Sequence, residues 1–213
     1  MKINREGKSK VLDTKELDLL LDYLPNNKHK LLAQVLRKTA CRVSEGIQLR
    51  YQNVTKDSIF FPKAITKGKL KSRFVPINEE FYNQIMQFKA DNELLKGETF
   101  TPDCYLFAGR FGTNTHLSVR AFQKALQAAC ERAEIIGFSS HGYRRSSLTH
   151  GSNNNIPIAH LAKISGHSNM QVLQEYLDCS ESQLREAVQN FGCLLYTSPS
   201  PRDLYRSRMP SSA

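Results

Sequence analysis

Apolar side chains recur at helical spacing along most of residues 1–192. The first stripe, from Leu17 to Leu24, follows the capping-box pair Asp13 and Glu16 and ends before Pro25. The same criteria predict further helices at 28–38, from Ser44 onward, and at 79–89, 118–133, 142–153, 157–165, 169–178 and 181–191. The chain is therefore expected to be mostly helical.

Two stretches rich in β-branched and aromatic residues, 58–65 and 73–77, predict strands. The basic, glycine-containing sequence TKGKLKS at 66–72 separates them and predicts a hairpin tip. Residues 91–117 show no regular period and are expected to be loop, with a short apolar run at 104–107. The pattern favours an α+β fold, mostly helical, with one small antiparallel sheet.

Residues 193–213 differ from the rest because their apolar residues follow neither the helical nor the strand period. They also hold three of the eight prolines. A natural disordered tail has the same texture. The segment can also be back-translated into DNA that resembles the adapter of transposase-based sequencing-library preparation. We interpret it as an adapter-derived, disordered tail. Residues 1–192 are then expected to form a single domain.

The composition, 40% hydrophobic and 23% charged, is typical of a globular protein rather than a disordered one. The chain has 30 basic and 20 acidic residues. Three Arg and one Asp lie in the tail, which leaves a charge of +8 on residues 1–192. This excess favours an anionic partner.

No apolar run approaches the roughly 18 residues that span a membrane, and the N-terminus lacks the apolar core of a secretory signal. The five cysteines are scattered and form no CxxC pair. We therefore expect a cytoplasmic protein with reduced thiols and no membrane partner.

Six polar residues spread along the chain are suited to chemistry on a phosphate. Taken singly, each has a structural interpretation, such as a solvated arginine, a capping histidine or a half-buried tyrosine. The six are Arg42, Lys67, His141, Arg144, His167 and Tyr176.

Together these residues lie in four motifs that resemble the tyrosine recombinases (phage integrase family). The motifs are TACRVSE at 39–45, TKGKLKSRFVPI at 66–77, HGYRR at 141–145 and SGHSNMQVLQEYL at 165–177. They are similar to the family's arginine box, lysine hairpin, H-x-x-R box and G-H box followed by a tyrosine. The resemblance covers roughly residues 12–191. Its details are most similar to small single-domain integrases of cyanobacterial or cyanophage type.

The resemblance implies a site-specific recombinase that cuts and rejoins double-stranded DNA through a 3′-phosphotyrosyl intermediate on Tyr176. Arg42 and Arg144 would stabilise the transition state, since guanidinium groups bind phosphate in bidentate fashion and keep their charge. A hairpin lysine would protonate the leaving oxygen, and the two histidines would serve as base or hydrogen-bond partners. No metal or cofactor is implied. Self-association into a tetramer on paired DNA sites is expected.

Several choices remain open at this point. Lys69 rivals Lys67, because the hairpin is one residue longer than in many relatives. Glu45 resembles the acid that orients the arginine, although a surface helix glutamate fits equally. Position 145 is Arg where many members have His, and the family's usual N-terminal clamp domain is missing from the sequence. Helix 118–133 either lies against DNA through Arg120 and Lys124 or carries a solvated basic face.

Three other classes of protein were weighed. A zinc protein would use His141, His150, His160, His167 and cysteines, but the spacing of the histidines fits no compact ligand set and the cysteines are not paired. A type IB topoisomerase shares the chemistry and would relax supercoils without a specific site. A non-catalytic DNA-binding relative is disfavoured because all six residue types are present.

Overall fold

The computed structural model describes residues 9–69, 71–167, 169–174, 177, 185 and 188. The chain divides into two units, residues 1–177 and 178–213, and the elements below belong to the first. The predicted boundary at 192 lies outside the described residues. So does the predicted helix 181–191, except for Arg185 and Val188, which are helical.

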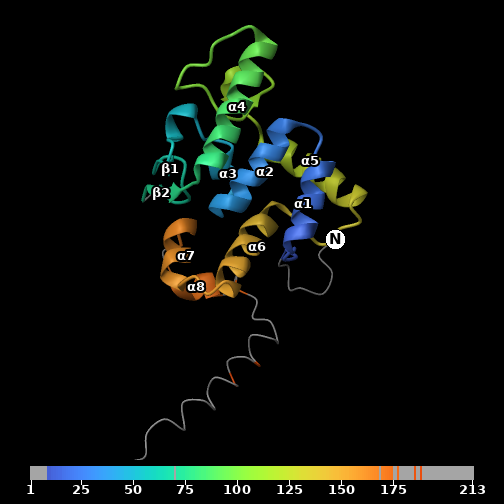
Figure 1. The fold of residues 1–213 in the computed structure, drawn as a ribbon, viewed down its shortest axis with the longest axis vertical. Coiled ribbons are helices and arrows are strands. Elements are labelled where there is room, and N and C mark those ends of the chain that lie inside the picture. Colours follow the sequence, from blue (N-terminus) through green and yellow to red (C-terminus); the bar gives the residue numbers. More distant parts are fainter. Residues whose placement is uncertain are drawn as a thin grey trace, which may run out of the picture. The chain divides into compact units, whose positions relative to one another are not determined.

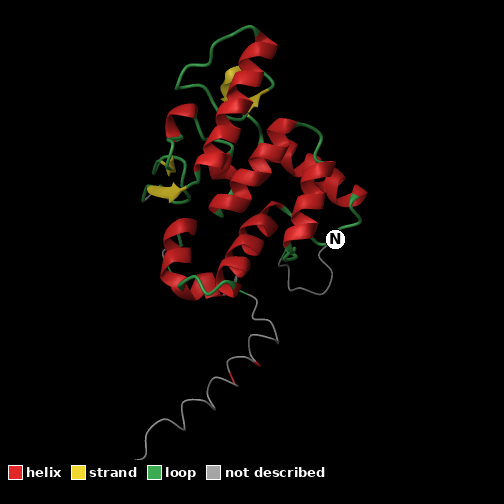
Figure 2. Ribbon diagram, in the orientation of Figure 1, coloured by secondary structure: helices red, strands yellow, loops and turns green. Residues whose placement is uncertain are grey.

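Helices form most of the first unit (Figures 1 and 2). They are α1 (Thr14–Tyr23), α2 (Asn27–Thr39), α3 (Val43–Gly46), α4 (Glu79–Lys96), α5 (Val119–Arg132), α6 (Ser140–Asn153), α7 (Ile158–Ser165) and α8 (Met170–Gln174), with a 3-10 turn at Tyr51–Asn53. The predicted mostly helical fold is confirmed. The start of α1 is also confirmed, because Asp13 and Glu16 form a reciprocal capping box.

The prediction of a loop over 91–117 was wrong at its start, which is helical, and near its end, where two short strands lie. Helix α4 continues to Lys96 and stops at Gly97, which takes the left-handed conformation with φ of 66°. Its last turns expose Leu94 and Leu95, so no inward apolar stripe signalled the helix there.

Two small antiparallel sheets are present rather than one. Strands β1 (Ser58–Phe61) and β2 (Arg73–Pro76) pair as predicted, with Ile59 opposite Val75. Strands β3 (Ala108–Gly109) and β4 (Gly112–His116) form a second pair. The sequence of β4, GTNTH, contains no apolar residue and therefore gave no alternating pattern.

A main apolar core joins α1, α2 and α5 to the β1–β2 hairpin and the start of α4. A smaller cluster holds the end of α2 against α6, α7 and α8; it consists of Ala40, Leu148, Leu161, Ala162 and Leu173. Helices α2 and α6 contact each other, and α7 contacts β2 (Figure 1). These contacts bring the motif-bearing segments together. Among the described residues, no helix is both long and apolar enough to cross a membrane.

Candidate active site

Arg42 is placed by a sharp turn between α2 and α3. Ala40 adopts a left-handed conformation with φ of 48°, and Arg42 then occupies the N-cap of α3. Its side chain is 22% exposed. The carboxylate of Glu45 accepts the Arg42 backbone N–H at 3.2 Å and its Nη1 at 3.1 Å. One glutamate thus caps the helix and orients the guanidinium.

Glu45 itself is fully buried, with 0% of its side chain exposed. Its Oε2 accepts from Nη2 of Arg73 at 2.6 Å, and its Oε1 accepts from the backbone N–H of Lys67 at 3.4 Å. Burial acts to raise the pKa of this carboxyl, but Arg73 and Arg42 outweigh burial and hold the pKa below its usual value. The interpretation of Glu45 as a surface glutamate is therefore wrong.

Arg144 lies on α6 and is 1% exposed. Its Nη1 donates to the carbonyl oxygens of Ala40 at 2.7 Å and Ser165 at 2.8 Å. Its Nη2 lies 3.0 Å from Nε2 and 3.2 Å from Nδ1 of His167. The guanidinium therefore joins the turn before Arg42 to the end of α7.

His167 follows Gly166, which ends α7 with φ of 72°. Its Nδ1 lies 2.8 Å from Oγ of Ser165, and that hydroxyl donates to the carbonyl of Leu161 at 2.6 Å. Because a hydroxyl has one proton to donate, Nδ1 is the donor to Ser165. Nε2 then accepts from Arg144.

The charge state of His167 follows from the same surroundings. Burial, and then the positive charges of Arg144, Arg42 and Arg73, lower its pKa to about 4. The imidazole is thus neutral near pH 7. It serves there as an acceptor for Arg144 rather than as an acid.

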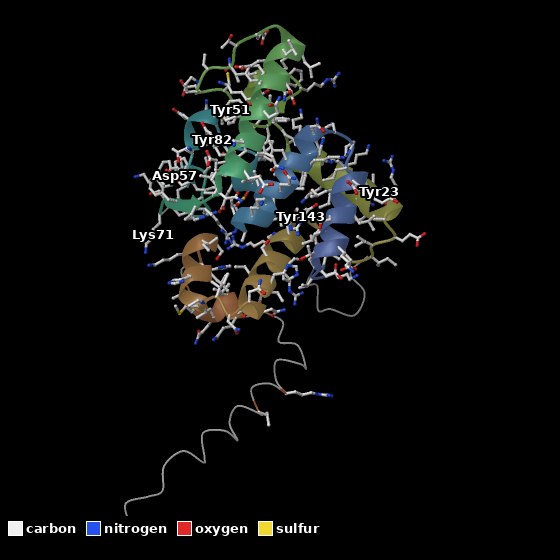
Figure 3. All side chains as sticks on the ribbon, in the orientation of Figure 1. Tyr23, Tyr51, Asp57, Lys71, Tyr82 and Tyr143 are labelled. Carbon is white, nitrogen blue, oxygen red and sulfur yellow. The ribbon has the colours of Figure 1, made fainter. Side chains whose placement is uncertain are left out.

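Arg42, His141 and Arg144 line one small pocket of about 70 Å³. Lys67 is exposed in the turn between β1 and β2, and only its backbone N–H reaches Glu45. Lys69 is also exposed, with φ of 51°. In Figure 3, Lys71 projects from the outer edge of this hairpin, whereas Tyr143 points into the helical core.

Tyr176, the predicted nucleophile, lies outside the described residues. Leu177, the next residue, packs against the small cluster that contains Ala40. Arg120 and Lys124 are exposed on α5. Among the described side chains, no group of three or more His, Cys, Asp or Glu could hold a metal ion.

Arg73 is not among the site residues predicted from the sequence, yet it contacts Glu45 and also donates from Nε to the carbonyl of Ile164 at 3.1 Å. A signal for it was present. Arg73 and Val75 are two apart on one strand and share a face, and Val75 is buried. A charged residue on the inward face of a strand needs a buried partner.

Comparison with known proteins shows which family the sequence is similar to. The sequence model of the phage integrase family matches residues 10–183. The tyrosine recombinase XerD of Staphylococcus saprophyticus is 28% identical over 168 residues, which cover 76% of this chain and 54% of the relative. The chain spans about half to three fifths of the length of the curated relatives it matches first.

Two solved structures show the similarity of fold. The XerA recombinase aligns with a TM-score of 0.69 and 21% identity, covering 85% of this chain and 65% of that one. The catalytic domain of bacteriophage HP1 integrase aligns with a TM-score of 0.61 and 22% identity, covering 85% of this chain and 95% of that one. The fold of the first unit is therefore that of a recombinase catalytic domain.

Proposed function

Because the chain belongs to the phage integrase family, we propose that it is a site-specific recombinase that cuts and rejoins double-stranded DNA. The observation that carries the proposal is the convergence of Arg42, His141 and Arg144 on one pocket. Nε2 of His167 lies 3.0 Å from Nη2 of Arg144. Two fixed positive charges beside a titratable imidazole suit a phosphodiester whose charge grows in the transition state.

In the proposed first step, the non-bridging phosphate oxygens bind Arg42 and Arg144. Arg144 is held by two carbonyls and by neutral His167, so it needs little rearrangement when charge develops. Arg42 is oriented by Glu45 and remains partly exposed. Both guanidinium groups keep their charge at every working pH.

The nucleophile in this proposal is Tyr176. Its phenolic oxygen attacks phosphorus, the bond from phosphorus to the 5′ oxygen breaks, and the DNA remains attached through its 3′ phosphate. His141 takes the phenolic proton, since the acceptor nitrogen of His167 is already occupied by Arg144. Lys67 gives a proton to the departing 5′ oxygen. The reverse sequence with a second 5′ hydroxyl rejoins the strands.

The wider role follows from the same chemistry. Exchange between two DNA sites requires several active sites held together, so we propose a tetramer on paired sites that serves the integration or excision of mobile DNA in the cytoplasm. The exposed pair Arg120 and Lys124 on α5 is a candidate contact to the phosphate backbone. Such binding weakens steeply as salt is raised.

Covalent trapping tests the proposal. The full chain is incubated with a pool of nicked duplexes of randomised sequence, in EDTA, and adducts that survive denaturing gels are recovered and sequenced. We expect an adduct with the wild-type chain and none with Tyr176→Phe. On the recovered sequence, Arg42→Ala and Arg144→Ala should cleave about 100-fold more slowly or worse while still binding DNA.

Two outcomes would overturn the assignment. An adduct formed by Tyr176→Phe would exclude this tyrosine as the nucleophile, and an activity abolished by EDTA would contradict a mechanism without metal. Relaxation of supercoiled DNA that contains no recovered site, without strand exchange between sites, would instead favour the topoisomerase-like alternative.

A further inference from the structure

Arg73 holds together segments that carry different parts of the site. It begins β2 and is 10% exposed. Its Nη2 donates to Oε2 of Glu45 at 2.6 Å, and its Nε donates to the carbonyl of Ile164 at 3.1 Å. Its guanidinium carbon lies 4.3 Å from the centre of the Phe61 ring. A planar, multiply donating group can satisfy these partners at once, and an ammonium cannot.

The turn that presents His167 rests on the same guanidinium. Gly166 has φ of 72°, and a Cβ built on it would lie 3.1 Å from Nη1 of Arg73. The backbone therefore approaches Arg73 as closely as a residue without a side chain allows. A shift of Arg73 would move Gly166 and, with it, the next residue, His167.

Arg73 also changes how the carboxylate of Glu45 binds the Arg42 side chain. A carboxylate beside a single arginine tends to bind it with both oxygens. Here Oε1 accepts from the Arg42 side chain and Oε2 from that of Arg73. The Arg42 guanidinium is thus oriented through one oxygen only, although Oε2 also accepts the Arg42 backbone N–H at 3.2 Å. The three groups together carry one net positive charge, whereas Glu45 and Arg42 alone would carry none.

We propose that Arg73 is a positioning residue for the recombination reaction, one that fixes Arg42 through Glu45 and His167 through the α7 terminus. It does not contact the DNA. The proposal rests on the proposed function, and it assigns to Arg73 a role that none of the six motif residues fills. Loss of Arg73 leaves Glu45 free to bind Arg42 with both oxygens and removes support from the Gly166 turn.

Three variants test this role. Arg73→Met keeps the length and the contact with the Phe61 ring but removes the charge. Arg73→Lys keeps the charge but cannot donate to Glu45 and Ile164 in the same geometry. Arg50→Met is the matched control, because Arg50 lies 4.2 Å from the Tyr105 ring and donates to the carbonyl of Asp103; it is not in the candidate site.

The first measurement needs no DNA. The imidazole of His167 is titrated by NMR in the full chain and in each variant. Removing the nearby charge in Arg73→Met should raise the pKa of His167 above its value of about 4. Arg73→Lys and Arg50→Met should leave the pKa near that value. An unchanged pKa in Arg73→Met would contradict a contribution of Arg73 to the electrostatics around His167.

The second measurement is single-turnover cleavage of the DNA recovered by covalent trapping. Arg73→Met should cleave about 10- to 100-fold more slowly, with DNA affinity changed less than about threefold. Arg73→Lys should recover part of this rate, and Arg50→Met should match the wild type. Equal losses of cleavage and affinity, or full activity of Arg73→Met, would overturn the proposal.

The two proposals fail in different ways. If the wild-type chain forms no adduct, the proposed function fails. The titration still tests whether Arg73 lowers the pKa of His167. If the wild type cleaves and Arg73→Met cleaves equally well, only the role of Arg73 is refuted. Should Arg73→Met not fold, Arg73→Lys carries the test, with slower cleavage at unchanged affinity expected and wild-type cleavage refuting the role.

Discussion

The carboxylate of Glu45 is shared by two guanidinium groups, Arg42 at 3.1 Å and Arg73 at 2.6 Å, in a place that solvent does not reach. Taking a carboxylate out of water is costly, and the pair of arginines offsets the cost. The arginines in turn depend on Glu45, since like charges this close repel. A change to any one of the three therefore affects the other two.

Glu45→Gln should reveal this dependence. The amide keeps the shape of the side chain but leaves two arginines without their counter-ion, so the free energy of unfolding should fall by about 2–4 kcal/mol. Urea unfolding measures it. Glu79→Gln is the control, because its ion pair with Lys56 is well exposed and should be worth less than about 1 kcal/mol. Equal losses in both variants would contradict a special role for Glu45.

His167 should make stability depend on pH in a defined window. Above pH 6.5 the imidazole is neutral in both the folded and the unfolded chain. Between pH 6.5 and about 4, the folded-state pKa, the unfolded chain binds a proton that the folded chain does not. The free energy of unfolding should therefore fall as the pH is lowered through this window, by about 1 kcal/mol after solvent screening.

The comparison with His167→Gln isolates this contribution, because glutamine accepts a hydrogen bond but does not titrate. Urea unfolding at several pH values should show a flatter profile for the variant. His29, whose pKa burial also lowers, titrates in both proteins and cancels in the difference. Parallel profiles would mean that His167 is not the responsible group.

Among the elements, the β1–β2 hairpin determines the positions of the two candidate lysines, Lys67 and Lys69. Its strands pair in register from Ser58 with Pro76 to Phe61 with Arg73. The turn then brings the backbone of Lys67 to Glu45 at 3.4 Å, whereas the backbone N–H of Lys69 donates to Thr66 at 3.0 Å. The hairpin is thus anchored to the arginine segment at Lys67.

This anchoring favours Lys67 over Lys69 as the general acid. With a substrate that carries sulfur at the 5′ bridging position, Lys67→Ala should regain most of its lost cleavage rate, because sulfur departs without a proton. Lys69→Ala is the control and should cleave both substrates much as the wild type does. Rescue confined to Lys69→Ala would reverse the assignment.

At the scale of the whole molecule, α6 joins segments that are distant in sequence. Besides Arg144, it carries Arg145, whose Nη1 donates to the carbonyl of Ser9 at 2.7 Å. It also carries Ser146, which accepts the N–H of Leu12 at 3.0 Å. Arg145 and Ser146 thus fasten the start of the described chain to the helix that carries Arg144.

If the interpretation of 193–213 as adapter-derived is right, we expect this segment to contribute nothing to the stability of the first unit. Its deletion is expected to change the free energy of unfolding by less than about 0.5 kcal/mol, since the apolar clusters described here are built from residues up to Leu177. Leu173→Ala is the contrasting variant. Leu173 is fully buried, and its truncation should cost about 2–5 kcal/mol. A comparable loss on deleting the segment would contradict the interpretation.

The sequence by itself predicted most of the described helices, the β1–β2 hairpin and the motif segments that carry Arg42, His141 and Arg144. These follow from signals that act over a few residues: apolar spacing, the cap at Asp13, and short motifs around Arg42, Arg144 and His167. Where such signals were weak, as in the polar end of α4 and in β4, the predictions were wrong.

Only the tertiary structure decided how those residues are charged and held. Arg73 meets Ile164 across 91 positions of sequence, and Arg144 meets Ala40 across 104. The burial of Glu45 and the neutral state of His167 depend on such long-range contacts. Desolvation and neighbouring charge are properties of a place in space, and a local pattern of residues does not contain them.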